Sequence, residues 1–310
     1  MTVLVSGSLA YDRIMPFAGY FKDNILPDKI HNLNVSFFVQ DLQESFGGTA
    51  GNIAYNLALL GQSAALLANV GSKDFDPYRI WLKKNKIDFT QVKILKNQQT
   101  ASAYIITDKA DNQISGFFPG AMRQPYQLQA NKLQANIAIV SPQNPSDMVK
   151  LPKIFKARKI PYIFDPGQQI TSLTKSGLIS GIAGSKILIG NDYEIDLIIK
   201  KTGWSMAALL GASETVVTTL GSKGSIIRQG KAIHRIPPAK PKDILDPTGA
   251  GDAYRAGLIY GLLKGWPLPK IGRLAGLVAV YTVEKYGTQT HKFSWADLAR
   301  RYRQNFSEKL

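Results

Sequence analysis

Short apolar runs alternate along the chain with segments of helical periodicity. Runs rich in aliphatic and β-branched residues predict strands at 3–5, 64–70, 137–140, 162–164, 187–189 and 215–219. Such continuously apolar runs are typical of strands buried on both faces of a parallel sheet. A polar residue or a glycine follows each run. Because the carboxyl ends of parallel strands meet at one edge of a sheet, we expect these residues to surround a ligand crevice.

Helices fit the gaps between these strands. Residues 50–60 and 270–286 read as helices, and Gly61 and Gly287 follow them where glycine often ends a helix. The alternation predicts an α/β fold with a doubly wound, mostly parallel sheet and helices on both faces. The segments 17–46 and 100–118 differ, since they carry aromatic residues in alternating patterns. We expect them to leave the main sheet and form a small β-sheet lid over the crevice.

Composition narrows the class of protein. The 310 residues allow one large or two ordinary domains, and 45% of them are hydrophobic, enough for a substantial core. No apolar run reaches about 18 residues, so we expect no membrane span. The first residues read as a strand and not as a signal peptide. The chain has no cysteine, which excludes disulfides and a cysteine nucleophile and fits a cytoplasmic protein.

The chain is strongly basic, with 38 lysines and arginines against 22 acidic residues and a formal charge of +16. Such a surface attracts nucleic acid or anionic small molecules such as nucleotides. The basic residues are dispersed, and Lys150, Lys153 and Lys156 fall three apart as on one solvated helix face. No zinc finger or aromatic–basic RNA motif accompanies them. The pattern therefore favours a small anionic ligand over nucleic acid.

The most informative stretch is Asp246-Pro247-Thr248-Gly249-Ala250-Gly251-Asp252, which leads into a predicted helix. Bare amides at Gly249, Ala250 and Gly251 would lie at the positive end of that helix, where phosphate binds. Asp252 would lie beside the phosphate as a base, so the stretch predicts phosphoryl transfer onto a hydroxyl. The alternative is a capping aspartate after an ordinary glycine turn. A dinucleotide fingerprint is excluded because Tyr254 occupies the third glycine position, and the chain has no Walker A motif.

Four other constellations carry candidate chemistry. Gly47-Gly48-Thr49-Ala50-Gly51-Asn52 lets backbone approach a ligand, or forms an ordinary loop before a helix. Asn191 and Glu194 could hold the water shell of Mg²⁺, or form a helix cap. Thr219-Leu220-Gly221-Ser222-Lys223-Gly224 could lie against a nucleotide, or form a hairpin turn. Asp12 follows the first strand, and a carboxylate there can accept two sugar hydroxyls.

In combination and order, these motifs resemble the ribokinase-like (phosphofructokinase B) sugar kinases. Over nearly the whole chain, further stretches are similar to the bacterial adenosine kinases of the mycobacterial type, among them Phe118-Pro119-Gly120-Ala121-Met122 and Gly287-Thr288-Gln289. The resemblance implies one ribokinase-like domain over 1–310, with a lid at roughly 13–46 and 97–122. It implies ATP- and Mg²⁺-dependent phosphorylation of the 5′-hydroxyl of adenosine. It suggests a homodimer through the lid, and a monovalent-cation requirement stays open.

Site roles follow from the resemblance residue by residue. Asp252 corresponds to the catalytic base, and Gly249, Ala250 and Gly251 to the anion hole. The positions that correspond to nucleoside contacts are Ser8, Asp12, Ser36, Gly48, Asn52, Phe117, Gln168 and Gln169. Those that correspond to ATP contacts are Asn191, Thr219, Gly221 and Gly224, with Glu194 acting on the metal through water. One departure is that Ala103, beside Tyr104, stands where the adenosine kinases have a second aromatic lid residue.

Other functions stay open at this level. Gln168, Gln169 and Phe117 favour a base-bearing substrate over a free sugar, which leaves ribokinase or fructokinase activity as the alternative within the enzyme class. A nucleoside-binding regulator without catalysis is the alternative from another class. The complete Asp252 motif argues against it, since a sensor needs no base.

Overall fold

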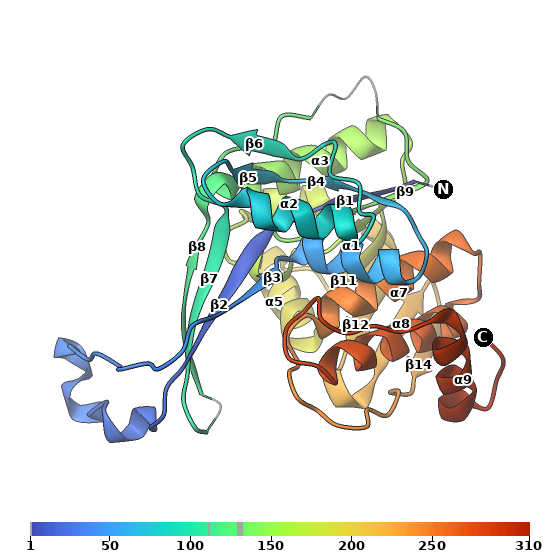
Figure 1. The fold of residues 1–310 in the computed structure, drawn as a ribbon. Helices are drawn as coiled ribbons and strands as arrows, with labels where there is room; N and C mark the ends of the chain where they lie inside the picture. Colours follow the sequence, from blue (N-terminus) through green and yellow to red (C-terminus); the bar gives the residue numbers. More distant parts are fainter. Residues whose placement is uncertain (1, 111, 129–132) are drawn as a thin grey trace.

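An eight-stranded sheet forms the centre of the computed structural model, which describes residues 2–110, 112–128 and 133–310 (Figure 1). Its strands lie in the order β14 (Ala232–Ile236), β13 (Ser225–Gln229), β12 (Ser213–Thr219), β11 (Ser185–Asn191), β10 (Tyr162–Phe164), β9 (Ile137–Val140), β1 (Val3–Ser6) and β4 (Ala64–Leu67). All neighbours are parallel except β12–β13 and β13–β14. The chain order reverses at β1, which has β4 on one side and β9 on the other. The predicted doubly wound, mostly parallel sheet is thus confirmed.

Helices cover both faces of this sheet. One face packs α1 (Thr49–Leu59), α2 (Phe75–Lys84), α7 (Ala250–Leu263) and α8 (Leu268–Val283), and α9 (Trp295–Phe306) packs outside α8. The other face packs α3 (Pro145–Ala157), α4 (Lys175–Ile182), α5 (Asp192–Thr202) and α6 (Met206–Ala212). Successive strand residues point to opposite faces, so Val3 and Val5 join the first core while Leu4 joins the second. Both faces are buried, which explains why the strands are apolar throughout.

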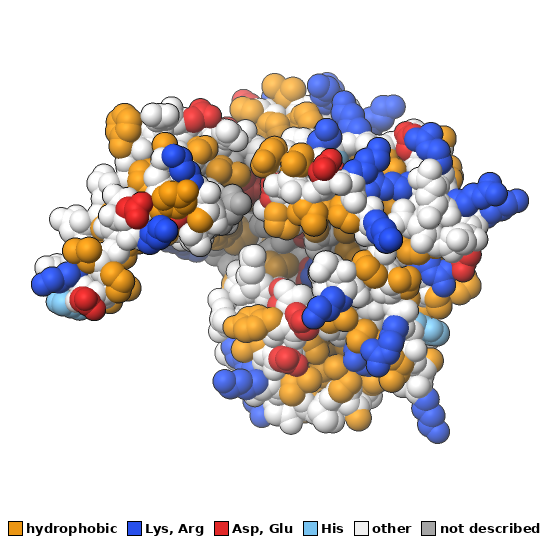
Figure 2. Space-filling view, turned by 90° about the horizontal axis from the view of Figure 1, so that it is seen from below, with side chains coloured by type: hydrophobic (Ala, Val, Ile, Leu, Met, Phe, Trp, Pro, Cys, Tyr) orange, Lys and Arg blue, Asp and Glu red, His pale blue; other side chains and the backbone are white. Residues whose placement is uncertain are grey.

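A second sheet stands at the edge of the main body (Figure 1). It has the order β3 (Gln43–Gly47), β2 (Ala10–Pro16), β7 (Ala101–Thr107) and β8 (Gln113–Phe118), with only β2 and β7 parallel. Between β2 and β3 the chain forms an arm, residues 17–42, with the 3-10 helices η1 (Phe21–Asp23) and η2 (Pro27–Asn32). Figure 2 shows the arm standing off from the body beside a hollow in the surface. The predicted small separate sheet is therefore present.

Two details of the sequence prediction were wrong. The apolar run at 64–70 is not one strand, because β4 ends at Leu67 and β5 (Asn69–Gly71) pairs instead with β6 (Lys93–Leu95). The whole run is buried, so its hydrophobicity could not reveal the change of partner. Helix α8 ends at Val283, and Gly287 is not its cap, since the Gly287 amide donates to the Asp246 carboxylate at 3.0 Å.

Two other expectations agree with the structure. Gly61 follows α1 with a positive φ of 74°, and its amide donates to the carbonyl of Ala58 at 3.0 Å. Lys150, Lys153 and Lys156 lie exposed on α3. Among the residues that the structure describes, no helix combines the length and the hydropathy needed to cross a bilayer.

Candidate active site

A cavity of about 640 Å³ lies at the carboxyl edge of the main sheet, beneath the small sheet. The small sheet contributes Asp12 from β2 and Phe117 from β8 at one end of this cavity. The loops after β11 and β12 contribute the other end, and the N-termini of α1 and α7 line the part between them. The cavity therefore crosses the strand ends at the predicted crevice, from the β1 side of the sheet to the β12 side.

The structure brings most of the predicted site residues to this one cavity. It is lined by Ser8, Asp12, Gly48, Asn52, Phe117, Gln168, Asn191, Glu194, Thr219, Gly221, Gly249, Gly251 and Asp252. These residues come from seven separate parts of the chain. Their common location follows from the rule that ties ligand sites to the carboxyl ends of parallel strands.

Four predicted residues do not line the cavity. Ser36 is exposed on the arm, away from the cavity wall. Gln169 follows Gln168 in a 3-10 turn, where only the first of the two reaches the cavity. Gly224 ends the 3-10 turn before β13, and its amide donates to the carbonyl of Gly221 at 3.1 Å. The amide of Ala250 donates to the carbonyl of Pro247 at 3.2 Å, within the turn itself.

Sequence reasoning did not select several residues that line the cavity, of which Asp165, Arg255 and Thr49 matter most. Asp165 follows β10, so its place at a strand end was a usable signal. Arg255 lies three residues after Asp252, and helical spacing puts the two on neighbouring faces of α7. Thr49 is the first residue of α1.

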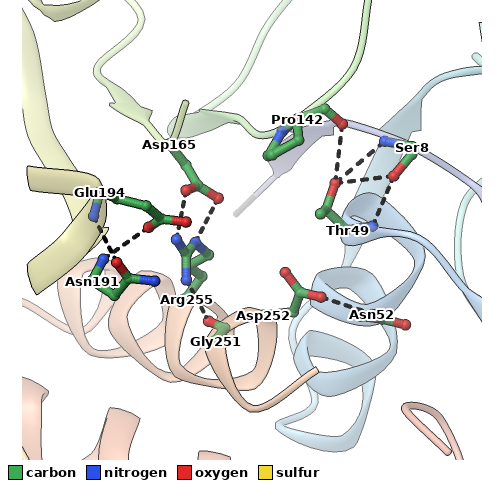
Figure 3. Close-up of polar contacts among 10 residues, drawn as sticks. All are labelled: Ser8, Thr49, Asn52, Pro142, Asp165, Asn191, Glu194, Gly251, Asp252 and Arg255. Atoms are coloured by element: carbon green, nitrogen blue, oxygen red, sulfur yellow. Dashed lines mark hydrogen bonds and ion pairs between the residues drawn. The ribbon is translucent and has the colours of Figure 1, made fainter. Parts of the chain in front are cut away.

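Asp252 lies in the first turn of α7 and does not cap that helix. The N-cap is Gly249, with φ of 78° and no side-chain capping bond. The Asp252 carboxylate instead accepts a hydrogen bond of 2.8 Å from the Asn52 amide on α1 (Figure 3). This contact joins residues that are 200 positions apart. The capping alternative therefore does not describe Asp252, whose side chain is held at the cavity wall.

The electrostatic surroundings of Asp252 suit a proton acceptor. Burial raises its pKa from 3.8 to about 7, and the carboxylates of Asp165 and Asp12 act in the same direction. Arg255 and the Asn52 hydrogen bond oppose this rise. A carboxyl whose pKa lies near neutrality can accept a proton from an alcohol and pass it on at physiological pH.

A buried ion pair lies next to the base. The Arg255 guanidinium donates two hydrogen bonds of 2.5 Å to the Asp165 carboxylate, and a third, of 2.9 Å, to the carbonyl of Gly251 (Figure 3). Both side chains are buried. The pair connects α7 to the end of β10 and brings a positive charge close to Asp252 and Glu194.

The N-terminus of α1 is tied to the first strand through Ser8 and Thr49. The Thr49 amide donates to the Ser8 hydroxyl at 3.0 Å, and the Ala50 amide donates to the Ser8 carbonyl at 3.0 Å. The Thr49 hydroxyl in turn donates to the carbonyl of Pro142 at 3.3 Å. These bonds place the glycine turn at residues 47–48 against the strand end.

At the other end of the cavity, both motifs form the local structure that the sequence left open as an alternative, and residues of each motif also line the cavity. Asn191 and Glu194 form a capping box on α5, with bonds of 2.7 and 2.8 Å, and both line the cavity. The segment 219–224 connects the antiparallel strands β12 and β13 as a hairpin, and Thr219 and Gly221 line the cavity. Local structure and ligand contact are therefore compatible at these positions.

The donor set argues against a metal held by protein ligands alone. Among the described residues, no group of three or more histidine, cysteine, aspartate or glutamate side chains could hold a metal ion. One oxygen of Glu194 already accepts the Asn191 amide. Mg²⁺ commonly binds through waters, one or two carboxylates and substrate phosphates. Glu194 fits that mode, as a contact through water.

Asp12 and Asp246 form a second pair of carboxylates near the cavity. Burial raises the pKa of Asp12 to about 6, and the charge of Asp246 adds to this rise. Asp246 accepts the amides of Thr248 at 2.9 Å and Gly287 at 3.0 Å, which ties the motif turn to the loop after α8. Asp12 is thus the free acceptor of the two, at the small-sheet end of the cavity.

The chain is similar to known kinases over most of its length. Residues 16–295 match the pfkB family of carbohydrate kinases. The nucleoside kinase of Methanothermobacter thermautotrophicus is 32% identical over 282 residues, which cover 89% of this chain and 90% of that protein. The nucleoside kinase of Methanocaldococcus jannaschii is 30% identical over 276 residues, or 88% and 91% of the two chains.

A solved structure agrees with these relatives. The nucleoside kinase of Burkholderia thailandensis in complex with inosine has a TM-score of 0.91 and 34% identity, and the alignment covers 99% of this chain and 100% of that chain. The chain belongs to the pfkB family of carbohydrate kinases and is a phosphotransferase with an alcohol acceptor.

Proposed function

We propose that this protein is a nucleoside kinase, which transfers the γ-phosphoryl group of ATP to the 5′-hydroxyl of a nucleoside, with adenosine as the substrate to test first. The observation that carries the proposal is the position of Asp252. Its carboxylate, with a pKa raised by burial to about 7, lies in the first turn of α7, at the helix end where Gly249 and Gly251 line the same cavity. A base and an anion-binding helix end in one cavity are what phosphoryl transfer to an alcohol requires.

The small-sheet end of the cavity suits a nucleoside. Asp12, Gly48 and Asn52 supply acceptors and donors for ribose hydroxyls. Phe117, an exposed aromatic residue on β8, supplies a face on which a base can stack. Gln168, in the 3-10 turn after β10, supplies an amide that both donates and accepts. A free sugar would leave Phe117 and Gln168 without a partner.

Catalysis is assigned to Asp252 and the start of α7. Asp252 accepts the proton of the 5′-hydroxyl as that oxygen attacks the γ-phosphorus and the bond to the β-phosphate oxygen breaks. The amide at Gly251, with the positive end of the helix, stabilises the charge on the transferring group. Arg255, held by Asp165, adds positive charge beside this path.

The far end of the cavity is assigned to ATP. Asn191, Thr219 and Gly221 line it and give polar groups and backbone space for the nucleotide. When bound, Mg²⁺ would offset the charge of the phosphates, and Glu194 would hold one of its waters. The choice of a nucleoside over a free sugar as the phosphate acceptor is supported by relatives that are named nucleoside kinases, one of them solved with inosine.

The test is a substrate panel with ATP and Mg²⁺. Adenosine, inosine, guanosine, cytidine, uridine, ribose and fructose are each incubated with the protein, and phosphorylated product is measured directly. Assays with Na⁺ and with K⁺ show whether a monovalent cation is needed. We expect turnover with at least one nucleoside, adenosine first, and little with the free sugars. Ala103 lines the cavity and gives the base one aromatic partner fewer, so we expect other nucleosides to be accepted as well; inosine is the next to test, since a similar nucleoside kinase is solved in complex with it.

Other outcomes overturn the proposal in different ways. Turnover with ribose or fructose alone would make the protein a sugar kinase of the same family. Nucleoside binding without any product would make it a nucleoside-binding regulator. Steeply salt-dependent retention on a nucleic-acid column at physiological ionic strength would indicate instead that the basic surface binds nucleic acid.

We also propose that the small sheet and the arm act as a lid of one kinase domain, and that two chains pair through it. The edge strand β8 is exposed along its whole length, and the arm exposes Leu26, Ile30 and Phe38. Unpaired edge strands and apolar side chains favour pairing with a second copy. Sedimentation should then give a dimer, and Phe38→Asp should shift it toward the monomer; a monomer in the unsubstituted protein would rule this out.

A further inference from the structure

A chain of buried hydrogen bonds lies behind the Asp252–Asn52 contact. The side-chain nitrogen of Gln289 donates to the side-chain oxygen of Asn52 at 3.0 Å and to the Tyr78 hydroxyl at 2.8 Å. The Trp81 indole donates to the side-chain oxygen of Gln289 at 2.8 Å. The chain therefore runs from Trp81 through Gln289 and Asn52 to Asp252, with Gln289 and Asn52 both buried.

Trp81 determines which end of each amide donates and which accepts in this series of hydrogen bonds. An indole N–H can only donate, so the oxygen of the Gln289 amide turns to Trp81 and its nitrogen turns to Asn52. The oxygen of the Asn52 amide must then accept from Gln289. Its nitrogen is left to face Asp252, and an N–H donor favours the ionised carboxylate over the protonated one. Without Gln289, Asn52 could reverse and present its oxygen to a protonated Asp252.

Tyr78 fixes Gln289 from the other side. Its hydroxyl donates to the carbonyl of Gly47 at 2.7 Å, so toward Gln289 it can only accept. Both hydrogens of the Gln289 amide nitrogen are then used, one on Asn52 and one on Tyr78. Burial raises the pKa of Tyr78 well above its usual range, which keeps this hydroxyl neutral. No alternative orientation of Gln289 satisfies all three neighbours.

A glycine of the first signature makes room for this arrangement. A Cβ atom on Gly51 would lie 2.0 Å from the Tyr78 hydroxyl and 3.0 Å from the Gln289 nitrogen. Real Cβ atoms do not approach another atom as closely as 2.0 Å, so any larger residue at this position would displace Tyr78, and the Gln289 nitrogen would also be crowded. Gly51 in the motif Gly47-Gly48-Thr49-Ala50-Gly51-Asn52 thus leaves space for the hydrogen bonds behind Asp252, in addition to any space that the motif leaves for a ligand.

We propose that Gln289 is a positioning residue for the reaction: it holds the Asn52 amide so that an N–H faces Asp252, and this keeps the base ionised and oriented toward the substrate hydroxyl. The inference rests on the proposed function, in which Asp252 is the base. It concerns a residue of the C-terminal loop, 237 positions from Asn52, that has no place in the cavity lining.

The other charged groups that act on Asp252 are not among the hydrogen-bond partners of Gln289 in the described part of the chain, which are Asn52, Tyr78 and Trp81. These charged groups are Arg255 on the same helix, Asp165 at the end of β10 and Asp12 on β2. Behind Asn52, on α1, Asn56 contacts His291, which is neutral because burial lowers its pKa to about 4. A shift in the titration of Asp252 after substitution at Gln289 therefore reports on the Asn52 amide.

The experiment compares Gln289→Met and Trp81→Phe with the unsubstituted enzyme. Gln289→Met removes the side chain that orients Asn52, whereas Trp81→Phe removes only the donor that turns the Gln289 oxygen away from Asn52; neither variant adds charge. We expect the acid limb of the kcat profile to move up by about one pH unit, since the N–H to carboxylate bond is no longer enforced. At pH 7, kcat should then fall roughly fivefold, and the nucleoside KM should change less. Gln289→Glu should give a larger shift, because a carboxylate there draws the Asn52 nitrogen away from Asp252.

Gln143→Met is the matched control. Gln143 is also a buried glutamine, and it donates to the Ser6 hydroxyl at 2.6 Å outside the cavity lining. It should lower the Tm to a similar extent while leaving the acid limb in place. Titration of ¹³C-labelled aspartate, in which Asp252→Asn identifies the signal of Asp252, measures the shift in the pKa of this carboxyl without relying on turnover.

The outcomes separate this inference from the proposed function. If Asp252→Asn keeps normal turnover, the base assignment fails. If Asp252→Asn is inactive while folded Gln289→Met and Trp81→Phe keep the original acid limb, only the positioning role of Gln289 fails. If Gln289→Met does not fold, Gln289→Glu, which keeps the size and shape of the side chain, carries the test.

Discussion

Arg255 and Asp165 form a bidentate ion pair across 90 residues of sequence, with both hydrogen bonds at 2.5 Å. The pair lies beside the cavity, where it joins the helix of the proposed base to the end of a central strand. It also holds in place an arginine whose charge opposes the rise in the pKa of Asp252. The position of α7 and the pKa of Asp252 therefore both depend on the Arg255–Asp165 contact.

Arg255→Met should destabilise the protein strongly. Removing one partner of a buried pair leaves an uncompensated charge, which typically costs about 3–5 kcal/mol. Urea unfolding should show this loss. The matched control is Arg300→Met, which breaks the exposed Arg300–Asp297 pair on α9, with side chains 68% and 42% exposed. It should cost less than about 1 kcal/mol. Equal effects of the two substitutions would contradict this account.

Asp252→Asn should reduce turnover by roughly 10²–10⁴-fold with little change in nucleoside affinity, since the lost function is proton acceptance. In the unsubstituted enzyme, a base with a pKa of about 7 must lose its proton to act. We therefore expect kcat to fall about tenfold per pH unit below neutrality and to level off above it. Initial rates and nucleoside titrations check both statements, and near-normal turnover of the variant would remove Asp252 from the mechanism.

The same substitution should stabilise the fold at alkaline pH. The folded-state pKa of Asp252 is raised from 3.8 to about 7, so the folded protein holds the extra proton between these values. Stability therefore falls as pH rises through this window, by at most about 4 kcal/mol. Asparagine carries no charge and avoids the loss. Asp252→Asn should thus melt higher than the unsubstituted protein at pH 8, and the difference should vanish toward pH 4.

Gly47→Ala should act on substrate binding through Asp12. A Cβ atom on Gly47 would lie 2.2 Å from an oxygen of the Asp12 carboxylate, so Asp12 must move. We expect Gly47→Ala and Asp12→Ala to raise the nucleoside KM alike, with kcat less affected, since Asp12 is assigned to the ribose. The double variant should be no worse than Asp12→Ala alone.

Gly276→Ala provides the control for this comparison. Gly276 lies in α8 with nothing within 4 Å of an added Cβ, so the substitution should stabilise the helix by about 1 kcal/mol or less and leave KM unchanged. Additive effects of Gly47→Ala and Asp12→Ala on KM would show that the glycine acts elsewhere.

The sequence by itself determined the local elements and the edge at which they meet. Apolar runs such as 137–140 and 162–164 became central strands, and the turn before Asp252 became a helix N-terminus. These features depend on hydrophobic period and turn chemistry, which act over a few residues. The rule that parallel strands share a carboxyl edge then brought most of the candidate residues to one cavity. The roles of these residues stay predictions.

Only the tertiary structure decided which side chains meet there. The Asp165–Arg255 pair, the direction of the Asn52 amide and the chain behind it join residues 90 to 237 positions apart. The arm, which stands away from the body, leaves Ser36 outside the cavity. The run 64–70 divides between two sheets although every residue in it is buried. Such choices depend on packing and hydrogen-bond partners from distant segments, for which a local pattern carries no signal.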